Sequence, residues 1–217
     1  MKEALDFLKK LNKNNNRDWF HTHKVVYDCV RKQMVDQVGD LIAKISKFDA
    51  SIKHLDASKS LFRINRDVRF SRNKNPYKTN FGAFLSPQGK KAEGAGYYFH
   101  LEPGKSFVAG GMYMPSPEAL AKVRQEIDYN LDTFNNILSN RTFKNNFGGL
   151  RKIDMLVNAP KGYPKDHPGV EHLRHKSFIV SRKVEDRDLA KGNFSSNAAS
   201  LFKCMHPFLV FLRSGTD

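Results

Sequence analysis

The fold class is decided by the segment Gly96-Tyr-Tyr-Phe-His-Leu101-Glu-Pro-Gly-Lys-Ser106-Phe-Val-Ala-Gly-Gly-Met-Tyr-Met114. Two apolar runs, 96–101 and 106–114, are joined by Glu102-Pro-Gly-Lys105, which is rich in residues that favour turns. Two strand-like runs joined by a short loop containing glycine predict a β-hairpin, whose strands are antiparallel. We therefore expect an antiparallel sheet in the middle of the chain.

Further strand patterns lie on both sides of this hairpin. Upstream, Phe81 to Leu85 forms an apolar run, and downstream Phe178-Ile-Val180 forms a shorter one. Still farther upstream, apolar residues alternate with polar ones in the period-two pattern of a half-buried strand: Phe62, Ile64, Val68 and Phe70. Strands that follow one another through short connections favour an antiparallel meander.

Helical patterns occupy the N-terminal part of the chain. Leu5, Leu8 and Leu11 recur at helical spacing, and the polar stretch 12–16 interrupts the pattern. Asp18 is then expected to cap a long helix, whose apolar stripe comprises Val26, Val30, Val38, Leu41, Ile42 and Ile45. Trp19 and Phe20 open this helix, and we expect them to anchor it on the core.

Other helices are predicted after the hairpin. Ser116 before Pro117 is a helix start, and His167 before Pro168 is expected to cap a short helix that extends to about Lys176. Ser195 or Ser196 is expected to cap a final helix, which Pro207 should kink or split. No internal repeat and no long linker is apparent. We predict a single α+β domain over residues 1–217, with an antiparallel β-meander sheet packed against several helices.

Composition restricts the class of protein. The 217 residues include two cysteines, Cys29 and Cys204, which exclude a disulfide framework and a thiolate zinc cage. Both are expected to be small core residues. No apolar run has the length of a membrane span, and the first ten residues carry charges where a secretory signal needs apolar residues. We therefore expect a cytoplasmic protein without a membrane partner; the sequence leaves the oligomeric state open.

Positive charge is concentrated in one segment. The formal net charge is +15, and residues 59–91 contain nine basic residues and one acid, Asp67. The basic residues are Lys59, Arg63, Arg66, Arg69, Arg72, Lys74, Lys78, Lys90 and Lys91. Such a surface should attract phosphates, acidic substrates or nucleic acid. A solvated basic face that only aids solubility is the alternative. Because the segment is rich in arginine, which is suited to planar, bidentate contacts with oxyanions, a binding function stays open beside it.

The candidate ligand-binding residues are Arg63, Arg66, Asp67, Arg69, Lys74, Tyr77, Lys78 and His167. In a strand, the side chains of Arg63, Asn65, Asp67 and Arg69 would project from one face at intervals of about 6.7 Å. Asp67 would then orient an arginine and leave other donors free, and the surrounding positive charge should lower its pKa.

The remaining candidates are assigned different roles. Lys74 or Tyr77 is the more suitable group to handle a proton, and His167, together with Lys176, is a second contributor to the anionic site. Arg66 falls on the apolar face, where a buried arginine needs an acidic or carbonyl partner.

The run Arg63-x-x-Arg-Asp-x-Arg-Phe70 with Asn73-Lys-x-Pro-Tyr-Lys-Thr79 resembles the signature of the domain-of-unknown-function 2461 family. Arg17-Asp-Trp-Phe20, Gly110-Gly-Met-Tyr-Met-Pro115, Pro160-Lys-Gly-Tyr163 and Asp166-His-Pro168 match it as well, so the resemblance covers nearly the whole chain. The resemblance implies a shared architecture and a shared polar segment. It supplies no activity, cofactor or partner.

Motifs for metals and cofactors are incomplete. His172 and His175 could share a helix face, but no third ligand accompanies them at fixed spacing. Gly104-Lys-Ser106 resembles the end of a phosphate-binding loop but lacks its first glycine, and Gly94-Ala-Gly96 lacks a following helix. Gly110-Gly111 within a strand indicates a bulge or a close backbone approach. We expect no metal site and no cofactor.

Three functions remain open at this point. The first is a module that binds a phosphate-bearing anion, with nucleic acid as a candidate ligand. The second is an enzyme acting on a small phosphorylated or carboxylated substrate. The third is a purely structural role of the arginines, with function on another surface. Outward-facing arginines with spare donors would favour the first two, and fully paired arginines would favour the third.

Overall fold

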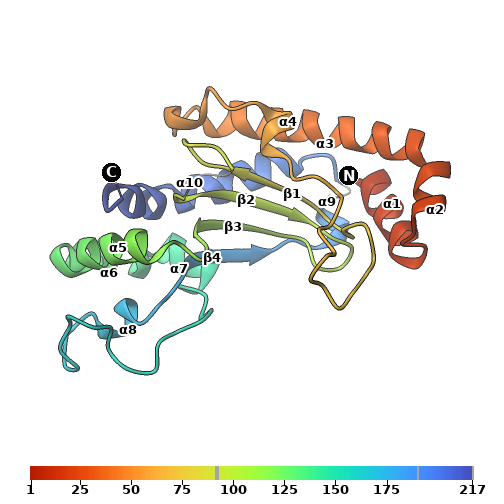
Figure 1. The fold of residues 1–217 in the computed structure, drawn as a ribbon. Coiled ribbons are helices and arrows are strands. Elements are labelled where there is room, and N and C mark those ends of the chain that lie inside the picture. Colours follow the sequence, from red (N-terminus) through yellow and green to blue (C-terminus); the bar gives the residue numbers. More distant parts are fainter. Residues whose placement is uncertain (91–92, 190, 217) are drawn as a thin grey trace. The chain divides into compact units, whose positions relative to one another are not determined.

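The computed structural model describes residues 1–90, 93–189 and 191–216 (Figure 1). The helices up to the sheet are α1 (Lys2–Lys13), α2 (Arg17–Thr22), α3 (Lys24–Ile45), the 3-10 helix η1 (Ala50–Ile52) and α4 (Ala57–Ser60). The strands are β1 (Phe81–Leu85), β2 (Gly96–Leu101), β3 (Phe107–Met112) and β4 (Phe178–Lys183). Between β3 and β4 lie α5 (Pro117–Tyr129), α6 (Leu131–Ser139), α7 (Arg141–Phe147) and α8 (Val170–Leu173), and α9 (Asp186–Leu189) and α10 (Phe194–Ser214) follow.

The four strands form one antiparallel sheet in the order β1-β2-β3-β4, and ten helices accompany it in the described chain. Strand order equals chain order, so the sheet is the predicted meander, and the α+β class is confirmed. The hairpin of β2 and β3 lies where the turn-forming residues 102–105 predicted it. Strand β1 has the predicted bounds, and Ser116 caps α5 by accepting a hydrogen bond from the Ala119 backbone N–H at 3.3 Å.

The chain divides into two compact units. Unit 1 draws on Met1–Leu85, Tyr98–Val108 and Lys183–Ala199, and unit 2 draws on Ser86–Tyr97, Ala109–Arg182 and Ser200–Asp217. Strands β2, β3 and β4 and helix α10 therefore contribute residues to both units. The extent of a single domain over 1–217 stays a prediction.

Aromatic residues build the core of unit 1. The Tyr27 ring of α3 stacks on Phe81 of β1 with centroids 6.4 Å apart, and Phe99 of β2 lies 4.4 Å from Phe194 of α10. The predicted leucines of α1 are buried because they share one face of that helix. Val26, which was predicted to belong to the buried stripe of α3, is 49% exposed; Tyr27 faces the core instead.

Phe134 of α6 is the centre of the core of unit 2. Its ring lies 5.0 Å from Phe211 and 6.5 Å from Phe178. Gly111 of β3 has a φ of +130°, and a Cβ on it would lie 1.9 Å from the carbonyl oxygen of Phe178. The glycine pair thus marks a close backbone approach, as its position in a strand predicted.

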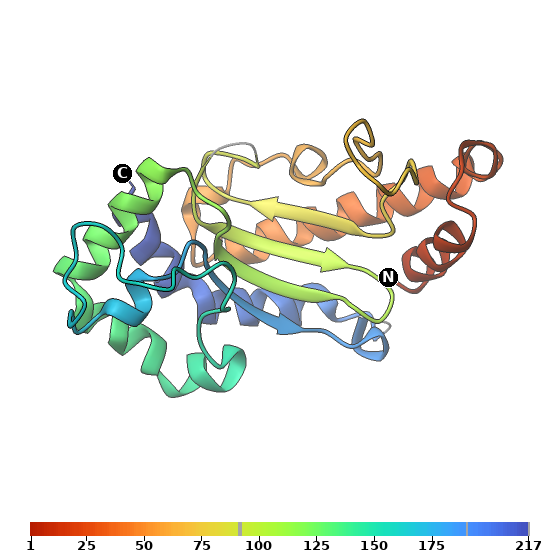
Figure 2. The ribbon, with the colours of Figure 1, turned by 60° about the horizontal axis from the view of Figure 1, so that its bottom comes forward.

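The alternating segment 62–70 is not a strand, and this prediction was wrong. Figures 1 and 2 show the gold segment between α4 and β1 as a long loop. Pairing with the returning chain occurs only at isolated bridges, Leu61 with Ala83 and Asn65 with Tyr77. Pro76 has no backbone N–H to donate, and the chain turns at Ser71, whose N–H bonds the Val68 carbonyl at 3.3 Å. A continuous ladder therefore cannot form.

Several predicted caps are also corrected. The predicted long helix is divided into α2 and α3, and Asp18 caps neither: Asn16 accepts from the Trp19 backbone N–H at 2.9 Å at the start of α2, and α3 has no side-chain cap. Helix α8 begins after Gly169, so His167 is not its cap. Ser195 and Ser196 lie inside α10, where the Ser195 hydroxyl donates to the Asp40 carboxylate. In α2 the neighbouring Asn16 side chain takes the capping role expected of Asp18, whereas α8 begins after a glycine and has no side-chain cap.

Other expectations fail through tertiary packing. Helix α10 continues through Pro207, so the expected split is wrong, while a kink at Pro207 stays a prediction. Cys29 is exposed and Cys204 is half-buried, so neither is a core residue.

Over the residues described, no helix combines the length and the apolarity that crossing a membrane requires.

Candidate functional site

Most predicted ligand-binding residues lie in one long loop of unit 1, residues 62–78, which we call the arginine loop. Its base is an irregular hairpin: the Phe62 N–H bonds the Gly82 carbonyl at 2.8 Å, and the Lys78 N–H bonds the Ile64 carbonyl at 2.8 Å. The loop contains six basic residues and one acid. Lys91, counted with the basic segment, lies outside the described residues.

Tyr77 anchors the loop. Its backbone N–H donates to Asn15 Oδ1 at 3.1 Å, and Asn15 Nδ2 donates back to the Tyr77 carbonyl at 3.0 Å. The Tyr77 ring is 6% exposed and stacks on Phe20 with centroids 4.0 Å apart. This burial suits an anchor that fixes the loop to α2, and it does not suit the proton-handling role assigned from sequence.

Arg66 and Lys74 hold the tip of the loop together. Arg66 is half-buried, and its Nη1 and Nη2 donate to the Asn75 carbonyl at 2.9 Å and the Ser71 hydroxyl at 3.2 Å. The Lys74 ammonium is exposed and donates to the Val68 carbonyl at 3.2 Å. Arg66 thus has the carbonyl partner that its position on the apolar side required.

Asp67 orients Arg69 in a bidentate pair. Arg69 Nε donates to Asp67 Oδ1 at 3.0 Å, and Nη2 donates to Oδ2 at 2.7 Å. These hydrogen bonds, together with one from the Arg69 backbone N–H and the charge of Arg63, hold the pKa of the Asp67 carboxyl below its ordinary value. The direction is the one predicted from sequence. The Nη1 group and one Nη2 hydrogen of Arg69 remain available for another acceptor.

Arg63 and Arg72 point their charges into solvent. Both are exposed, and neither guanidinium forms a hydrogen bond or ion pair with any residue that the structure describes. Arg72 was counted in the basic segment but not selected as a ligand-binding residue. The guanidinium N–H groups of Arg63 and Arg72 are therefore available to a ligand, and of these two residues only Arg63 was among the predicted ligand-binding residues.

Phe70 projects from the tip of the same loop. Its side chain is 96% exposed, and the Arg69 guanidinium carbon lies 5.9 Å from the ring centroid. The alternating pattern had placed Phe70 on a buried face, and that prediction fails with the strand. An almost fully exposed phenylalanine is unusual, because burial of an aromatic ring is strongly favourable.

Lys78 connects the loop to the sheet. Its ammonium lies 5.5 Å from the centroid of the Phe62 ring, and that ring packs edge-on against Tyr98 of β2 with centroids 6.4 Å apart. The Phe62 ring thus contacts both Lys78 and a second polar cluster of unit 1.

The second cluster is a hydrogen-bonded relay of Tyr98, His100 and Glu102. Tyr98 Oη lies 2.9 Å from His100 Nδ1, and His100 Nε2 lies 3.1 Å from Glu102 Oε2. Because an ionised carboxylate only accepts, Nε2 carries the hydrogen in the neutral ring, and Nδ1 accepts from the Tyr98 hydroxyl. Burial, followed by the charge of Glu102, raises the pKa of Tyr98 to about 12.

Sequence reasoning missed this relay. Its residues stand at positions i, i+2 and i+4, which share one face of an extended chain. That spacing was the available signal. Gly82 of β1 leaves room for the Tyr98 hydroxyl, because a Cβ at position 82 would lie 2.6 Å from Tyr98 Oη.

The predicted contributor His167 belongs to unit 2, whereas the arginine loop belongs to unit 1. Its Nε2 lies 2.8 Å from Asp128 Oδ1, and its Nδ1 accepts from the Gly169 N–H at 3.0 Å. Both ring nitrogens are thus engaged, which fits a residue that ties the loop before α8 to α5. A role for His167 in anion binding stays a prediction.

His172 of α8 and His175, which follows that helix, do not form a metal pair: His172 is bonded internally, and the buried Nδ1 of His175 has no hydrogen-bond partner among the described residues. His172 Nε2 lies 2.9 Å from Asn135 Oδ1, and burial lowers the pKa values of His172 and His175. Within the described ranges, no group of three or more His, Cys, Asp or Glu side chains is arranged to hold a metal ion.

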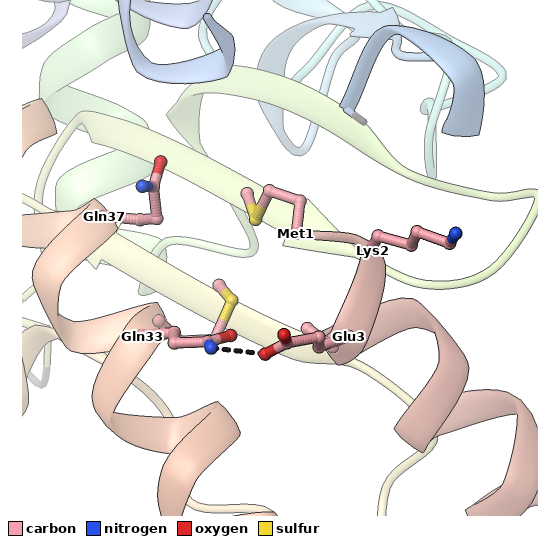
Figure 3. A pocket seen from close by; sticks show the side chains of 7 residues that line it. Met1, Lys2, Glu3, Gln33 and Gln37 are labelled. Carbon is pink, nitrogen blue, oxygen red and sulfur yellow. Dashed lines mark hydrogen bonds between the residues drawn. The ribbon is translucent and has the colours of Figure 1, made fainter. Parts of the chain in front are cut away.

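One hollow of about 300 Å³ lies beside the start of α1 (Figure 3). The Gln33 side chain donates to the Glu3 carboxylate across it. Its lining comprises Met1, Lys2, Glu3, Ala4, Gln33, Met34 and Gln37. The hollow contains none of the predicted ligand-binding residues, so the arginine loop remains the candidate site.

Comparison with known proteins places the chain in a family. Neither a curated protein nor a solved structure matches it. A family model described as "Conserved hypothetical protein (DUF2461)" matches residues 3–211, which include the arginine loop and the relay. The chain therefore belongs to the DUF2461 family of conserved hypothetical proteins.

Proposed function

We propose that the protein binds a phosphate-bearing anion through the arginine loop. The observation that carries the proposal is that Arg63 and Arg72 are exposed and form no hydrogen bond or ion pair with a described residue, whereas Arg66 in the same loop is bonded to the Asn75 carbonyl. A purely structural cluster would have its guanidiniums paired, because paired donors are what stabilise a fold. Arg69 and Lys74 add two further exposed cations.

The loop is prepared for such a ligand before it binds. Tyr77 fixes the base, Arg66 closes the tip, and Asp67 holds the plane of Arg69. Pre-ordered donors lose less conformational entropy on binding than free side chains do. The net charge of +15 would also accelerate the encounter with a polyanion.

The test is binding of fluorescently labelled inorganic polyphosphate at several salt concentrations. Four phosphate contacts predict a slope of log K against log salt of about −3. The double variant Arg63→Ala/Arg72→Ala should weaken binding at least ~10-fold at low salt, with an unchanged melting temperature. Salt-independent affinity would contradict the proposal.

A matched control separates the loop from general basicity. Lys161 and Lys165 are both exposed and belong to unit 2. The variant Lys161→Ala/Lys165→Ala removes the same charge and should lower the affinity less than ~3-fold. Equal losses in the two double variants would show that net charge alone attracts the polyanion.

The Tyr98–His100–Glu102 relay favours a second candidate function, an enzyme acting on a small phosphorylated substrate. Tyr98 can take a proton from a bound water while its own proton passes to His100, and Glu102 then pairs with the imidazolium. The water oxygen would attack phosphorus as the bond to the leaving oxygen breaks. The raised pKa of Tyr98 favours this shuttle over a stable phenolate.

The second candidate is tested with para-nitrophenyl phosphate. Wild-type turnover should fall at least ~100-fold in Tyr98→Phe, which keeps the ring and removes the hydroxyl. Tyr113→Phe, at a 65% exposed tyrosine outside the relay, is the control and should keep full activity. A wild-type protein without turnover, or a Tyr98→Phe variant with normal turnover, counts against the enzyme.

A further inference from the structure

We propose that the ligand of the arginine loop is a single-stranded nucleic acid, with one unpaired base stacked on Phe70. The inference rests on the proposed anion-binding function and names the class of its ligand. Its observation is independent of the charges: Phe70 is 96% exposed, the highest value among the exposed large apolar side chains of the described chain.

The surroundings of Phe70 suit both parts of a nucleotide, its base and its phosphate. An apolar ring offers a face to a base, and cations within the same loop offer donors to its phosphate. Arg69 lies 5.9 Å from the Phe70 ring centroid, and Arg72 follows two residues later with its guanidinium in solvent. Single-stranded nucleic acid is recognised by this combination of stacking and positive charge.

The loop holds Phe70 outward. Arg66 bonds Ser71 directly after Phe70, and Lys74 bonds the Val68 and Arg69 carbonyls directly before it, at 3.2 and 3.4 Å. These contacts close the tip on both sides of the ring. A base that stacks on Phe70 therefore does not have to order the tip, and little of the binding free energy is lost to ordering.

Other polyanions fit the tip less well. Inorganic polyphosphate would use the cations and leave the ring in water. In a duplex the base faces are already stacked on one another, so the Phe70 ring gains no contact with them. A lipid surface would favour several inserted apolar side chains, whereas the neighbours of Phe70 are Arg69, Ser71 and Arg72.

The experiment compares two probes, a labelled oligo-uridylate and labelled polyphosphate of equal charge. Phe70→Ala should weaken oligo-uridylate binding about 10-fold and leave polyphosphate binding unchanged. Tyr129→Ala is the control, because Tyr129 is an exposed aromatic residue, at 73%, of unit 2. It should change neither affinity.

A tryptophan variant reports the stacking directly. Trp19 is the single tryptophan, so Trp19→Phe/Phe70→Trp leaves one indole at the loop tip. Its fluorescence should be quenched by oligo-uridylate and not by polyphosphate, with the oligo-uridylate affinity retained. Absence of quenching at saturating oligo-uridylate would overturn the inference.

The outcomes separate the two proposals. If neither probe binds, the anion-binding function fails. If both bind and Phe70→Ala affects neither, anion binding holds and base stacking is overturned. If Phe70→Ala instead abolishes binding to vesicles of phosphatidylglycerol and phosphatidylcholine while oligo-uridylate binding is unchanged, the partner is a membrane surface and the nucleic-acid inference is overturned.

Discussion

At the scale of single residues, this fold depends on two kinds of position. At the first, neighbouring backbone leaves no space for a side chain; at the second, a side chain supplies the hydrogen bonds that neighbouring polar groups need. Gly111 is the strongest case of the first kind, because a Cβ there meets the Phe178 carbonyl oxygen at 1.9 Å. Arg66 is a case of the second kind, because it serves two acceptors at the tip of the arginine loop.

Gly111→Ala should therefore destabilise the protein by about 3 kcal/mol or more, since both the φ of +130° and the clash with backbone oppose a side chain. Denaturant unfolding followed by circular dichroism measures the change. Gly104→Ala, where φ is +73° but nothing lies within 4 Å, is the control and should cost about 1–2 kcal/mol. Equal costs would mean that the close approach is absent.

Arg66→Met should cost about 1–2 kcal/mol, because it removes two hydrogen bonds to neutral acceptors from a half-buried side chain. Arg63→Met, at an exposed arginine of the same loop, should change the unfolding free energy by less than about 0.5 kcal/mol. The same denaturation assay measures both. If Arg66→Met leaves the unfolding free energy unchanged, Arg66 does not stabilise the tip of the loop.

At the scale of elements, two segments of unit 1 carry the candidate chemistry. The arginine loop takes its shape from hydrogen bonds at its base and tip, while strand β2 places Tyr98 and His100 of the relay, and Glu102 follows the strand directly. Both can be examined by titration, because each contains a group whose pKa is displaced from its ordinary value by a named neighbour.

Asp67 should titrate below the ordinary aspartate pKa, because its ionised form accepts hydrogen bonds from Arg69. The ionised pair supports the loop above the ordinary pKa, and this support is lost as the pH falls through the lowered value. Carbon-detected NMR of the aspartate carboxyls follows the titration. Arg69→Gln should return the midpoint towards the ordinary value, whereas Arg72→Gln should leave it in place.

Tyr98 should ionise at about pH 12, because it is buried and lies near Glu102. A pKa raised above the unfolded value of 10.0 favours the protonated native state, so this contribution is complete below pH 10 and is lost as the pH rises towards 12. The difference in tyrosinate absorbance between wild type and Tyr98→Phe isolates the group. An ionisation at the ordinary pKa would contradict the buried relay.

At the scale of the whole molecule, the charge balance sets the response to salt. The net charge of +15 produces self-repulsion, which added salt screens. An anion that binds the native protein specifically stabilises it beyond this screening.

Phosphate should therefore raise the melting temperature more than chloride at equal ionic strength, by a few degrees at concentrations well above its dissociation constant. Differential scanning fluorimetry measures the shift. Arg63→Ala/Arg72→Ala should retain the rise caused by chloride and lose the additional rise caused by phosphate. An unchanged phosphate effect in this variant would place the anion elsewhere.

Local patterns were sufficient for much of the secondary structure. The β2–β3 hairpin follows from Glu102-Pro-Gly-Lys105 between apolar runs, and α5 follows from Ser116 and Pro117, because turn and cap preferences depend on adjacent residues. The segment 62–70 was misread as a strand. The alternation of polar and apolar residues indicates which face of a strand each side chain would occupy. A strand also needs a neighbouring segment with continuous backbone N–H donors, and Pro76, which has none, interrupts the segment that pairs with 62–70.

The sequence by itself determined the α+β class, the meander, the concentration of arginine in one segment and membership of the family, because each depends on local order or composition. Only the tertiary structure decided which arginines are free and that Phe70 stands in solvent. The spacing of Tyr98, His100 and Glu102 was present in the sequence, and the structure added that their side chains are hydrogen-bonded in series. Partners of side chains come from distant residues, as Asn15 and Tyr77 do across 62 positions. Folding alone brings such pairs together, so no local pattern could reveal which donors remain unused.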